Sequence, residues 1–189
     1  MRVTGGIFCG RRLQTVQAAP LRPTQDRVRE ALFSSLADVL PGCAFLDLYA
    51  GTGAVGIEAW SRGAARVCWV EQNRRVFRVL TDNIRSLSDD ISHSNLTPQC
   101  LPVEAFCRRA YTAPFDIVFA DPPYARNRAT KVDVALLLAE SALLKPDGLF
   151  ILEQGGDEPV PSGCRGWQLL RERRYGSSML RFFHGKGAE

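Results

Sequence analysis

The chain is poor in the residues that build metal and disulfide sites. It has only two histidines, His93 and His184, which are far apart and have no cysteine at a metal-ligand spacing, so we expect no bound metal. Its six cysteines show no C-x-x-C pattern. Several of them fall within expected strands, which is typical of reduced residues in a core.

Long apolar runs are also missing. No segment approaches eighteen uninterrupted apolar residues, and Met1 is followed by Arg-Val-Thr-Gly-Gly rather than by an apolar stretch of signal-peptide type. We therefore expect a cytoplasmic protein that does not enter the membrane. Its 189 residues, 46% of them hydrophobic, suit one domain with a substantial core and a small appendage. We predict a monomer.

Lysine is rare, and nearly all of the 24 basic residues are arginine. The net charge is only +4, but six arginines fall within the first thirty positions: Arg2, Arg11, Arg12, Arg22, Arg27 and Arg29. Arginine binds phosphate with two parallel hydrogen bonds and stacks on bases, so this cluster indicates a nucleic-acid partner. An arginine-rich genome would produce the same pattern.

Two segments precede the main body of the chain. Residues 1–23 are short pieces broken by Gly5-Gly6, Gly10 and Pro20, which predicts a β-hairpin or an extended arm. We interpret residues 1–23 as a nucleic-acid-binding appendage with little capacity to form a core, and residues 24–189 as the main domain. Within that domain, apolar residues recur at helical spacing over 24–40, where Pro41-Gly42 ends the pattern.

The remaining chain alternates strands and helices. Strands are expected at 45–48, 66–70, 99–103, 115–120 and 149–152, with helices at 54–62, 74–87 and 131–144. This order predicts an α/β fold with a parallel sheet covered on both faces. Residues 167–170 and 179–183 are expected to form a terminal antiparallel pair.

The most informative stretch is Asp121-Pro122-Pro123-Tyr124, directly after the apolar run 115–120. In open α/β folds, ligands bind at the carboxyl ends of the strands. The Asp121 carboxylate can accept one N–H of an exocyclic amine, and the carbonyl of Pro122 can accept the other. Tyr124 offers a ring on which a flipped base can stack. A plain Pro-Pro turn is the alternative.

A glycine motif, Gly51-Thr52-Gly53-Ala54-Val55-Gly56, follows the expected strand 45–48. Alone, it would indicate a dinucleotide. However, Asp47 before it would face a pyrophosphate unfavourably and suits a ligand ammonium group, while Glu71 at the next strand end suits ribose hydroxyls. A ribose and an ammonium group without phosphate describe S-adenosylmethionine. Glu104-Ala105-Phe106 could hold the adenine, although a solvated Glu104 is equally consistent with the sequence.

The chain resembles a known family at these residues. The segment from Leu46 to Ala59, the segment from Arg22 to Phe33 that begins Arg-Pro-Thr, and Asp121-Pro122-Pro123-Tyr124 together are similar to the small bacterial 16S rRNA guanine-N2 methyltransferases of the RsmD type. The similarity covers most of the chain. The amine-binding tetrapeptide also occurs in DNA adenine methyltransferases, whereas its combination with the Arg-Pro-Thr helix start is highly specific.

The resemblance implies a class I, Rossmann-like methyltransferase fold of seven mostly parallel strands, with S-adenosylmethionine as donor and a guanine of 16S rRNA or the small ribosomal subunit as acceptor. It assigns the target base to residues Asp121, Pro122, Pro123 and Tyr124. It assigns the cofactor to Asp47, Tyr49, Ala50, Gly51, Thr52, Gly53, Glu71, Gln72, Glu104, Ala105 and Asp121. RNA contacts are expected at Arg2, Arg11, Arg12, Arg22, Thr24, Arg27 and Tyr175. Tyr49, Thr52 and Glu104 depart mildly from the family pattern.

Four alternatives remain. A DNA adenine N6-methyltransferase or another RNA amino-methyltransferase would share the methyl donor and the amine clamp, by which we mean Asp121 and the Pro122 carbonyl. The DNA enzymes, however, usually carry a target-recognition domain for which this chain has no room. A nicotinamide oxidoreductase leaves Asp47 and the Asp-Pro-Pro-Tyr stretch unexplained. A non-enzymatic RNA-binding module would not need intact residues at every catalytic position.

Overall fold

The computed structural model describes residues 1–16, 23–87, 95–109, 113–123, 133–161, 164 and 166–185, with the side chains of residues 23–25 left out. Seven strands form one sheet in the order β3-β2-β1-β4-β5-β7-β6. In chain order the strands are β1 (Ala44–Leu48), β2 (Arg66–Val70), β3 (Leu96–Gln99), β4 (Phe115–Ala120), β5 (Leu144–Gly155), β6 (Trp167–Tyr175) and β7 (Ser178–Gly185).

Strands β1 to β5 run parallel, whereas β7 pairs antiparallel with both β5 and β6. This arrangement confirms the prediction of a seven-stranded, mostly parallel sheet that ends in an antiparallel pair. The central strands are buried along almost their whole length, as expected where helices cover both faces.

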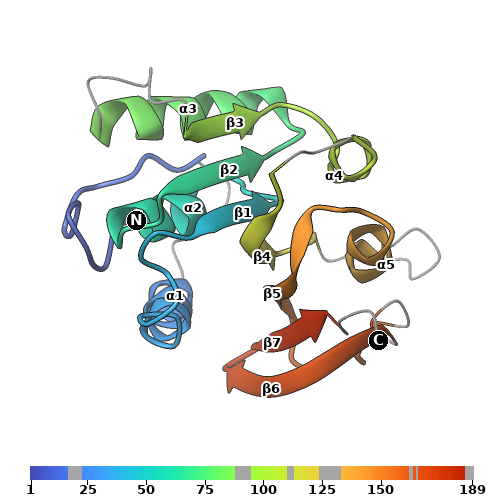
Figure 1. Cartoon of the computed structure of the whole chain (residues 1–189). Helices are drawn as coiled ribbons and strands as arrows, with labels where there is room; N and C mark the ends of the chain where they lie inside the picture. Colours follow the sequence, from blue (N-terminus) through green and yellow to red (C-terminus); the bar gives the residue numbers. More distant parts are fainter. Residues whose placement is uncertain are drawn as a thin grey trace.

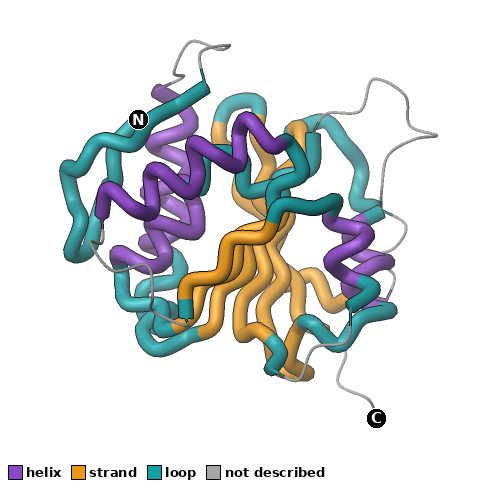
Figure 2. The backbone as a smooth tube through the Cα atoms, turned by 90° about the horizontal axis from the view of Figure 1, so that it is seen from above, coloured by secondary structure: helices purple, strands orange, loops and turns teal. Residues whose placement is uncertain are grey.

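Five helices supply those two layers. They are α1 (Pro23–Ser34), α2 (Ala54–Ser61), α3 (Arg74–Leu87), α4 (Val103–Cys107) and α5 (Val134–Ala139). Helices α1, α2 and α3 pack on one face of the sheet and α4 and α5 on the other (Figure 1 and Figure 2). Two hydrophobic clusters result, one centred on Phe45 and Phe119 and the other on Val118 and Phe150.

The amino-terminal segment, residues 1–16, folds back on itself through a bridge between Arg2 and Arg12. The expectation that it has little capacity to form a core is wrong, because Val3 and Leu13 are buried. The hydroxyl of Thr4 donates to the buried Glu58 carboxylate of α2 at 2.7 Å. The segment is therefore packed onto the domain. Its role as a separate RNA-binding unit stays a prediction.

Gly6 shows how closely this segment approaches α2. Its φ is +77°, and a Cβ there would lie 1.8 Å from the backbone oxygen of Ser61. The Ser61 hydroxyl donates to the carbonyl of Gly5, and Ser61 oxygens accept from the backbone N–H groups of Ile7 and Phe8. Only glycine satisfies both the left-handed backbone and this contact.

Most expected elements lie where the sequence placed them, but several bounds differ, and β6 and β7 are both longer than the predicted 167–170 and 179–183. The predicted helix 24–40 ends at Ser34, α5 is shorter than the predicted 131–144, and β5 is longer than the predicted 149–152. The prediction of a strand at 99–103 is wrong: β3 covers Leu96–Gln99, and Val103 begins α4. Because β3 is an edge strand with a neighbour on one side only, the missing backbone N–H of Pro98 need not remove a hydrogen bond between strands.

Candidate active site at the carboxyl edge of the sheet

The register between β1 and β4 brings the two main sequence motifs together. Leu48 of β1 pairs with Ala120 of β4 in parallel, so Tyr49 and Asp121 are the next residues on neighbouring strands. The glycine turn after β1 and the Asp-Pro-Pro stretch after β4 therefore meet at one edge of the sheet, as predicted for a ligand site.

The turn after β1 depends on backbone conformations that few residues adopt. Gly51 and Gly53 have φ values of +56° and +85°, and Tyr49 has a φ of +60°. A Cβ on Gly51 would meet no atom within 4 Å, so its backbone faces open space that a ligand can approach. A Cβ on Gly56 would lie 2.1 Å from the indole nitrogen of Trp69, so this glycine allows α2 to pack on β2.

A cavity of about 240 Å³ lies beside this turn. Three carboxylates from three neighbouring strands line it, namely Asp47 of β1, Asp121 after β4 and Glu153 of β5. Among the residues that the structure describes, no Lys or Arg side chain forms an ion pair with any of the three. Such a cavity favours a cationic ligand, because unpaired buried carboxylates are costly without one.

The carboxylates of the cavity have perturbed pKa values. Asp47 is 1% exposed and accepts a hydrogen bond from the Gly56 backbone N–H at 2.8 Å. Burial raises the pKa of Asp47 to about 7, opposed by that hydrogen bond and supported by the charge of Glu71. The pKa of Asp121 is also raised, first by desolvation and then by the charges of Glu153 and Asp47. Asp121 still exposes much of its surface to the open cavity, so water screens part of this effect.

A second cavity, of about 340 Å³, adjoins the first and shares Tyr49, Gly51 and Asp121 with it. Glu71 and Gln72 line it from the end of β2. The two oxygens of Glu71 accept from the backbone N–H groups of Gly51 at 3.0 Å and Asn73 at 2.6 Å. These bonds fix the Glu71 carboxylate at the wall of the cavity.

The predicted cofactor residues thus fall into two groups. The residues that line one or both cavities are Asp47, Tyr49, Ala50, Gly51, Thr52, Glu71, Gln72 and Asp121. Gly53 lies behind them as the N-terminal cap of α2. Glu104 and Ala105 are not among the lining residues; they lie in α4, and Val103 takes their place at the wall. Val103 was missed because the sequence placed it in a strand.

Glu104 nevertheless lies near the site. After desolvation, its charge is the next cause of the raised pKa of Tyr49, whose buried hydroxyl has no hydrogen-bond partner among the described residues. Of the predicted target-base residues, Pro123 lines the second cavity and Pro122 is adjacent to Asp121. Tyr124 lies outside the described residues.

Glu153 was also missed, although a signal for it exists. It directly follows the apolar run 149–152, just as Asp121 follows 115–120. Leu152 pairs with Ala120, so the two acids occupy equivalent positions on adjacent parallel strands.

The predicted RNA-binding residues are spread over several elements. Arg2, Arg11 and Arg12 are exposed on the amino-terminal segment, and Arg27 is exposed on α1. Tyr175 ends β6 and pairs with Ser178, which also pairs with the carboxyl end of β5, so Tyr175 lies at the same edge as the cavities. Arg22 and the side chain of Thr24 lie outside the described residues.

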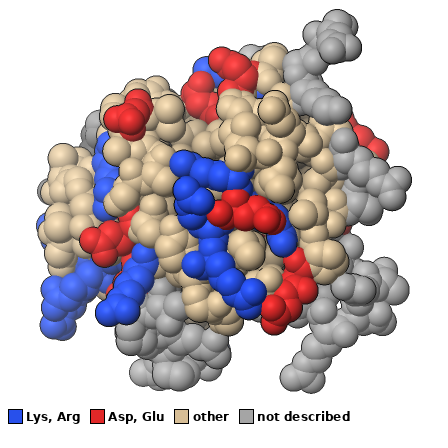
Figure 3. Space-filling model, turned by 90° about the horizontal axis from the view of Figure 1, so that it is seen from below, with Lys and Arg blue, Asp and Glu red and all other residues tan. Residues whose placement is uncertain are grey.

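Seen from below, basic side chains gather over the face that contains β6, with acidic side chains between them (Figure 3). On β6, Arg173 and Arg174 are exposed and Arg171 is partly exposed. Arg174 pairs with Asp157 at 2.9 Å, and Arg171 stacks on Phe182. This strand therefore carries part of the basic surface that the sequence placed mainly in the first thirty residues.

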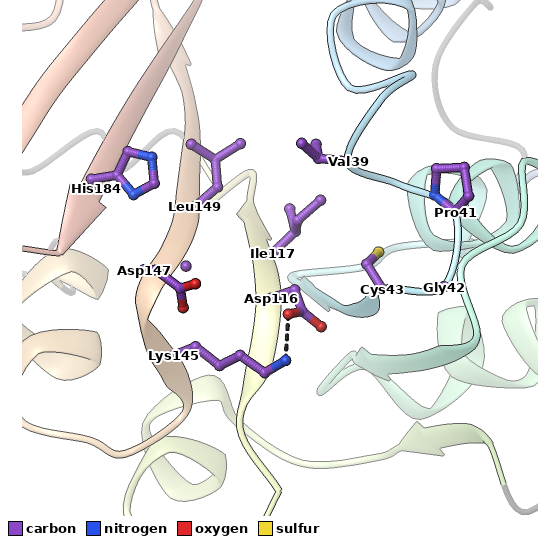
Figure 4. A pocket seen from close by; sticks show the side chains of 11 residues that line it. Val39, Pro41, Gly42, Cys43, Asp116, Ile117, Lys145, Asp147, Leu149 and His184 are labelled. Carbon is purple, nitrogen blue, oxygen red and sulfur yellow. Dashed lines mark hydrogen bonds and ion pairs between the residues drawn. The ribbon is translucent and has the colours of Figure 1, made fainter.

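A larger cavity, of about 390 Å³, lies at the opposite edge of the sheet (Figure 4). It is lined by two acidic residues, the exposed Asp147 and Asp116. Asp116 accepts from Lys145 at 2.5 Å and from the backbone N–H of Ala44 at 2.8 Å. These partners hold the pKa of Asp116 below its usual value, against the opposing effect of desolvation. Because this charge is already satisfied within the fold, we assign the functional site to the carboxyl edge despite the smaller volumes there.

The described part of the chain contains no helix that is long and apolar enough to cross a membrane. No three ligating side chains in it lie close enough together to hold a metal ion, the carboxylates of the cavity included.

Comparisons with known proteins agree on one family. The family model described as "Conserved hypothetical protein 95" matches residues 1–184. The chain is 33% identical to "Ribosomal RNA small subunit methyltransferase D" of Haemophilus influenzae, over 97% of this chain and 93% of that protein. It is 34% identical to the protein of the same name from Escherichia coli K12, over 97% and 89%.

Solved structures show the same likeness. The putative methyltransferase yhhF of Escherichia coli has a TM-score of 0.85 and 32% identity, covering 100% of this chain and 99% of that chain. A T. thermophilus 16S rRNA N2 methyltransferase in complex with AdoMet and guanosine has a TM-score of 0.66 and 24% identity, covering 89% of this chain and 44% of that one. The latter likeness concerns the fold.

Proposed function

The chain belongs to the RsmD-type family of ribosomal RNA methyltransferases, and from this premise we propose that it transfers a methyl group from S-adenosylmethionine to the exocyclic N2 amine of a guanine in small-subunit (16S) rRNA. The family and the class I methyltransferase fold confirm the corresponding predictions. The observation that carries the finer proposal is the convergence of Asp47 and Asp121 on one cavity.

The cavities fit the cofactor. When bound, S-adenosylmethionine supplies an electrophilic methyl group on a positively charged sulfur. The unpaired carboxylates suit its two positive charges, and the exposed backbone at Gly51 allows close approach. Asp47 would hold the ammonium group and Glu71 the ribose hydroxyls. A pyrophosphate would face the same carboxylates with like charge, which disfavours the nicotinamide alternative.

Asp121 and the carbonyl of Pro122 would hold the target amine. The lone pair of an aromatic amine is delocalised into the ring, so hydrogen bonds from its N–H groups to two acceptors favour rehybridisation and stabilise the developing positive charge. The rest of the rate comes from positioning the amine against the methyl group. Stacking of the base on Tyr124 belongs to the same proposal.

RNA would approach over the basic residues around this edge. We propose phosphate contacts for Arg2, Arg11, Arg12, Arg22 and Arg27, with Thr24 and Tyr175 nearer the base. Because residues 1–16 carry buried core residues, deleting them would test folding as well as binding. Replacing Arg11 and Arg12 by Ala is the cleaner variant and should reduce the slope of log affinity against log salt by about 1–2. An unchanged slope would place the contacts elsewhere.

Nucleoside mass mapping tests the substrate. In cells that lack this gene, 16S rRNA is expected to lose one N2-methylguanine, and the purified protein is expected to restore it on rRNA or on small subunits from those cells. Restoration by wild type but not by Asp121→Ala would tie the reaction to the clamp. Loss of a methylated adenine from DNA instead would identify the alternative enzyme, and loss of no methylated nucleoside would reject both.

A further inference from the structure

We infer that Glu153 is a positioning residue that acts through Asp121: its carboxylate, held beside Asp121 at the end of β5, makes Asp121 the group that receives the proton of the methylated amine. The inference rests on the proposed function. It adds a residue that none of the sequence motifs includes.

Strand register carries the geometry. Ala120 of β4 pairs with Leu152 of β5 in parallel, so Asp121 and Glu153 follow at equivalent positions. Equivalent residues on parallel neighbours point to the same face of the sheet. Both side chains accordingly line the same cavity.

A second contact distinguishes the two carboxyl groups. Burial raises the pKa of Glu153, and the neighbouring Ser178 side chain in β7 opposes this rise by favouring the ionised form. In contrast, no other described residue donates a hydrogen bond to the Asp121 carboxylate. The two carboxyl groups therefore titrate as a coupled pair, in which the negative charge of Glu153 opposes ionisation of Asp121.

The other groups around the cavity do not cancel this charge. Asp47 of β1 adds a further negative charge. Arg29 of α1 lines the cavity, but it is engaged with Asp26 at 3.1 Å and with Glu58 at 3.4 Å. The remaining titratable side chain at the wall is Tyr49, whose raised pKa keeps it neutral. Met1 also lines the cavity, and its terminal ammonium forms no ion pair with Asp121 or Glu153.

The reaction requires a proton acceptor. The lone pair of N2 forms the new N–C bond, and the electron pair of the broken C–S bond stays with sulfur. N2 must then release one proton to become a neutral methylamine. Asp121 already accepts a hydrogen bond from this amine in the proposed function, and the charge of Glu153 makes its carboxylate the stronger base.

The test compares Glu153→Gln, which removes the charge, with Glu153→Asp, which keeps it. Carbon-detected NMR of the cofactor-free protein, with labelled carboxyl groups, follows the titration of Asp121 directly. In Glu153→Gln we expect Asp121 to titrate at lower pH, by about half a unit or more. In Glu153→Asp we expect a smaller change. Unchanged titration of Asp121 in folded Glu153→Gln would overturn the inference.

The pH profile of methylation provides a second readout. In Glu153→Gln, the acid limb of the pH–rate profile is expected to move to lower pH. The maximal methylation rate is expected to be about tenfold lower, because Asp121 is then a weaker base. A lower rate without movement of the limb would mean a structural role only. If Glu153→Gln does not fold, Ser178→Ala serves instead and should raise the pH at which Glu153 itself titrates; no rise would overturn the inference.

These outcomes also separate the inference from its premise. Absence of methyl transfer to guanine by the wild-type protein would reject the proposed function, whereas the NMR titrations would still decide whether Glu153 controls Asp121. Methyl transfer with no coupling between the two carboxyls would reject the inference alone.

Discussion

Both the amino edge and the carboxyl edge of the sheet place aspartates next to a cavity, but the aspartates differ in their partners and in the direction of their pKa shifts. At the amino edge, Asp116 has Lys145 and a backbone N–H as partners, and its pKa is lowered. At the carboxyl edge, Asp47, Asp121 and Glu153 line one cavity without a described basic partner, and their pKa values are raised.

We interpret this as the difference between a structural charge and one that is available to a ligand. A paired carboxylate stabilises the fold, whereas an unpaired buried carboxylate lowers stability until a ligand supplies the opposite charge. Cavity size alone does not separate the edges, since the amino-edge cavity has about 390 Å³ and the two adjoining carboxyl-edge cavities have about 240 Å³ and about 340 Å³.

The largest expected effect is on the rate. Asp121→Ala should lower the methylation rate by about 10²–10³-fold and leave cofactor affinity nearly unchanged, because the contact with the amine strengthens mainly in the transition state. Single-turnover assays and calorimetry measure the two quantities. The amino-edge variant Asp116→Ala is the matched control. If Asp121→Ala methylates at the wild-type rate, the Asp121-Pro122-Pro123 stretch is only a structural turn and does not hold the target amine.

Next in size is an effect on binding. Asp47→Ala should weaken binding of S-adenosylmethionine by about 1–3 kcal/mol, because it removes the partner of a buried ammonium group. Calorimetry with S-adenosylmethionine and with NAD tests this. Asp47→Asn, which keeps an acceptor for Gly56, should also raise the stability of the cofactor-free protein near pH 8. Tight binding of NAD and none of S-adenosylmethionine would contradict the assignment.

The two edges should respond oppositely to pH. The pKa of Asp47 is raised to about 7, so its favourable contribution to stability is present at low pH and is lost as the pH rises towards 7. The pKa of Asp116 is lowered, so its contribution is present at neutral pH and is lost as the pH falls through that value. Cofactor affinity should rise about tenfold between roughly pH 6 and pH 8 as Asp47 ionises. A flat affinity would separate Asp47 from the ammonium group.

The smallest expected effect is at the amino edge. Asp116→Ala should lower the free energy of unfolding by about 1 kcal/mol through the lost partner of the Ala44 N–H, with an unchanged methylation rate. Its pair with Lys145 is partly exposed, so the ion pair itself contributes little. Chemical denaturation measures the stability. A large loss of activity in this variant would break the distinction between the edges.

Much of the fold was predictable because the central strands carry their own signal. The strands at 66–70 and 115–120 and the helix at 74–87 have the predicted bounds, since continuous apolar runs and helical periodicity are local properties. The strand at 99–103 was misplaced: β3 contains Pro98, which is acceptable only because β3 lies at the edge of the sheet. Glu104 and Ala105, which were predicted to hold the cofactor, lie in α4 and do not line either cavity.

The sequence by itself determined the chemistry at each strand end: the left-handed glycines of the turn, Asp47 before them, and Asp121 followed by two prolines. Each depends on neighbouring residues, whose effect on the backbone is local. Only the tertiary structure decided that Glu153 lies beside Asp121, that Asp116 is paired and Asp121 is not, and that residues 1–16 pack on α2. These facts depend on register and packing between segments far apart in the chain, which no local pattern encodes.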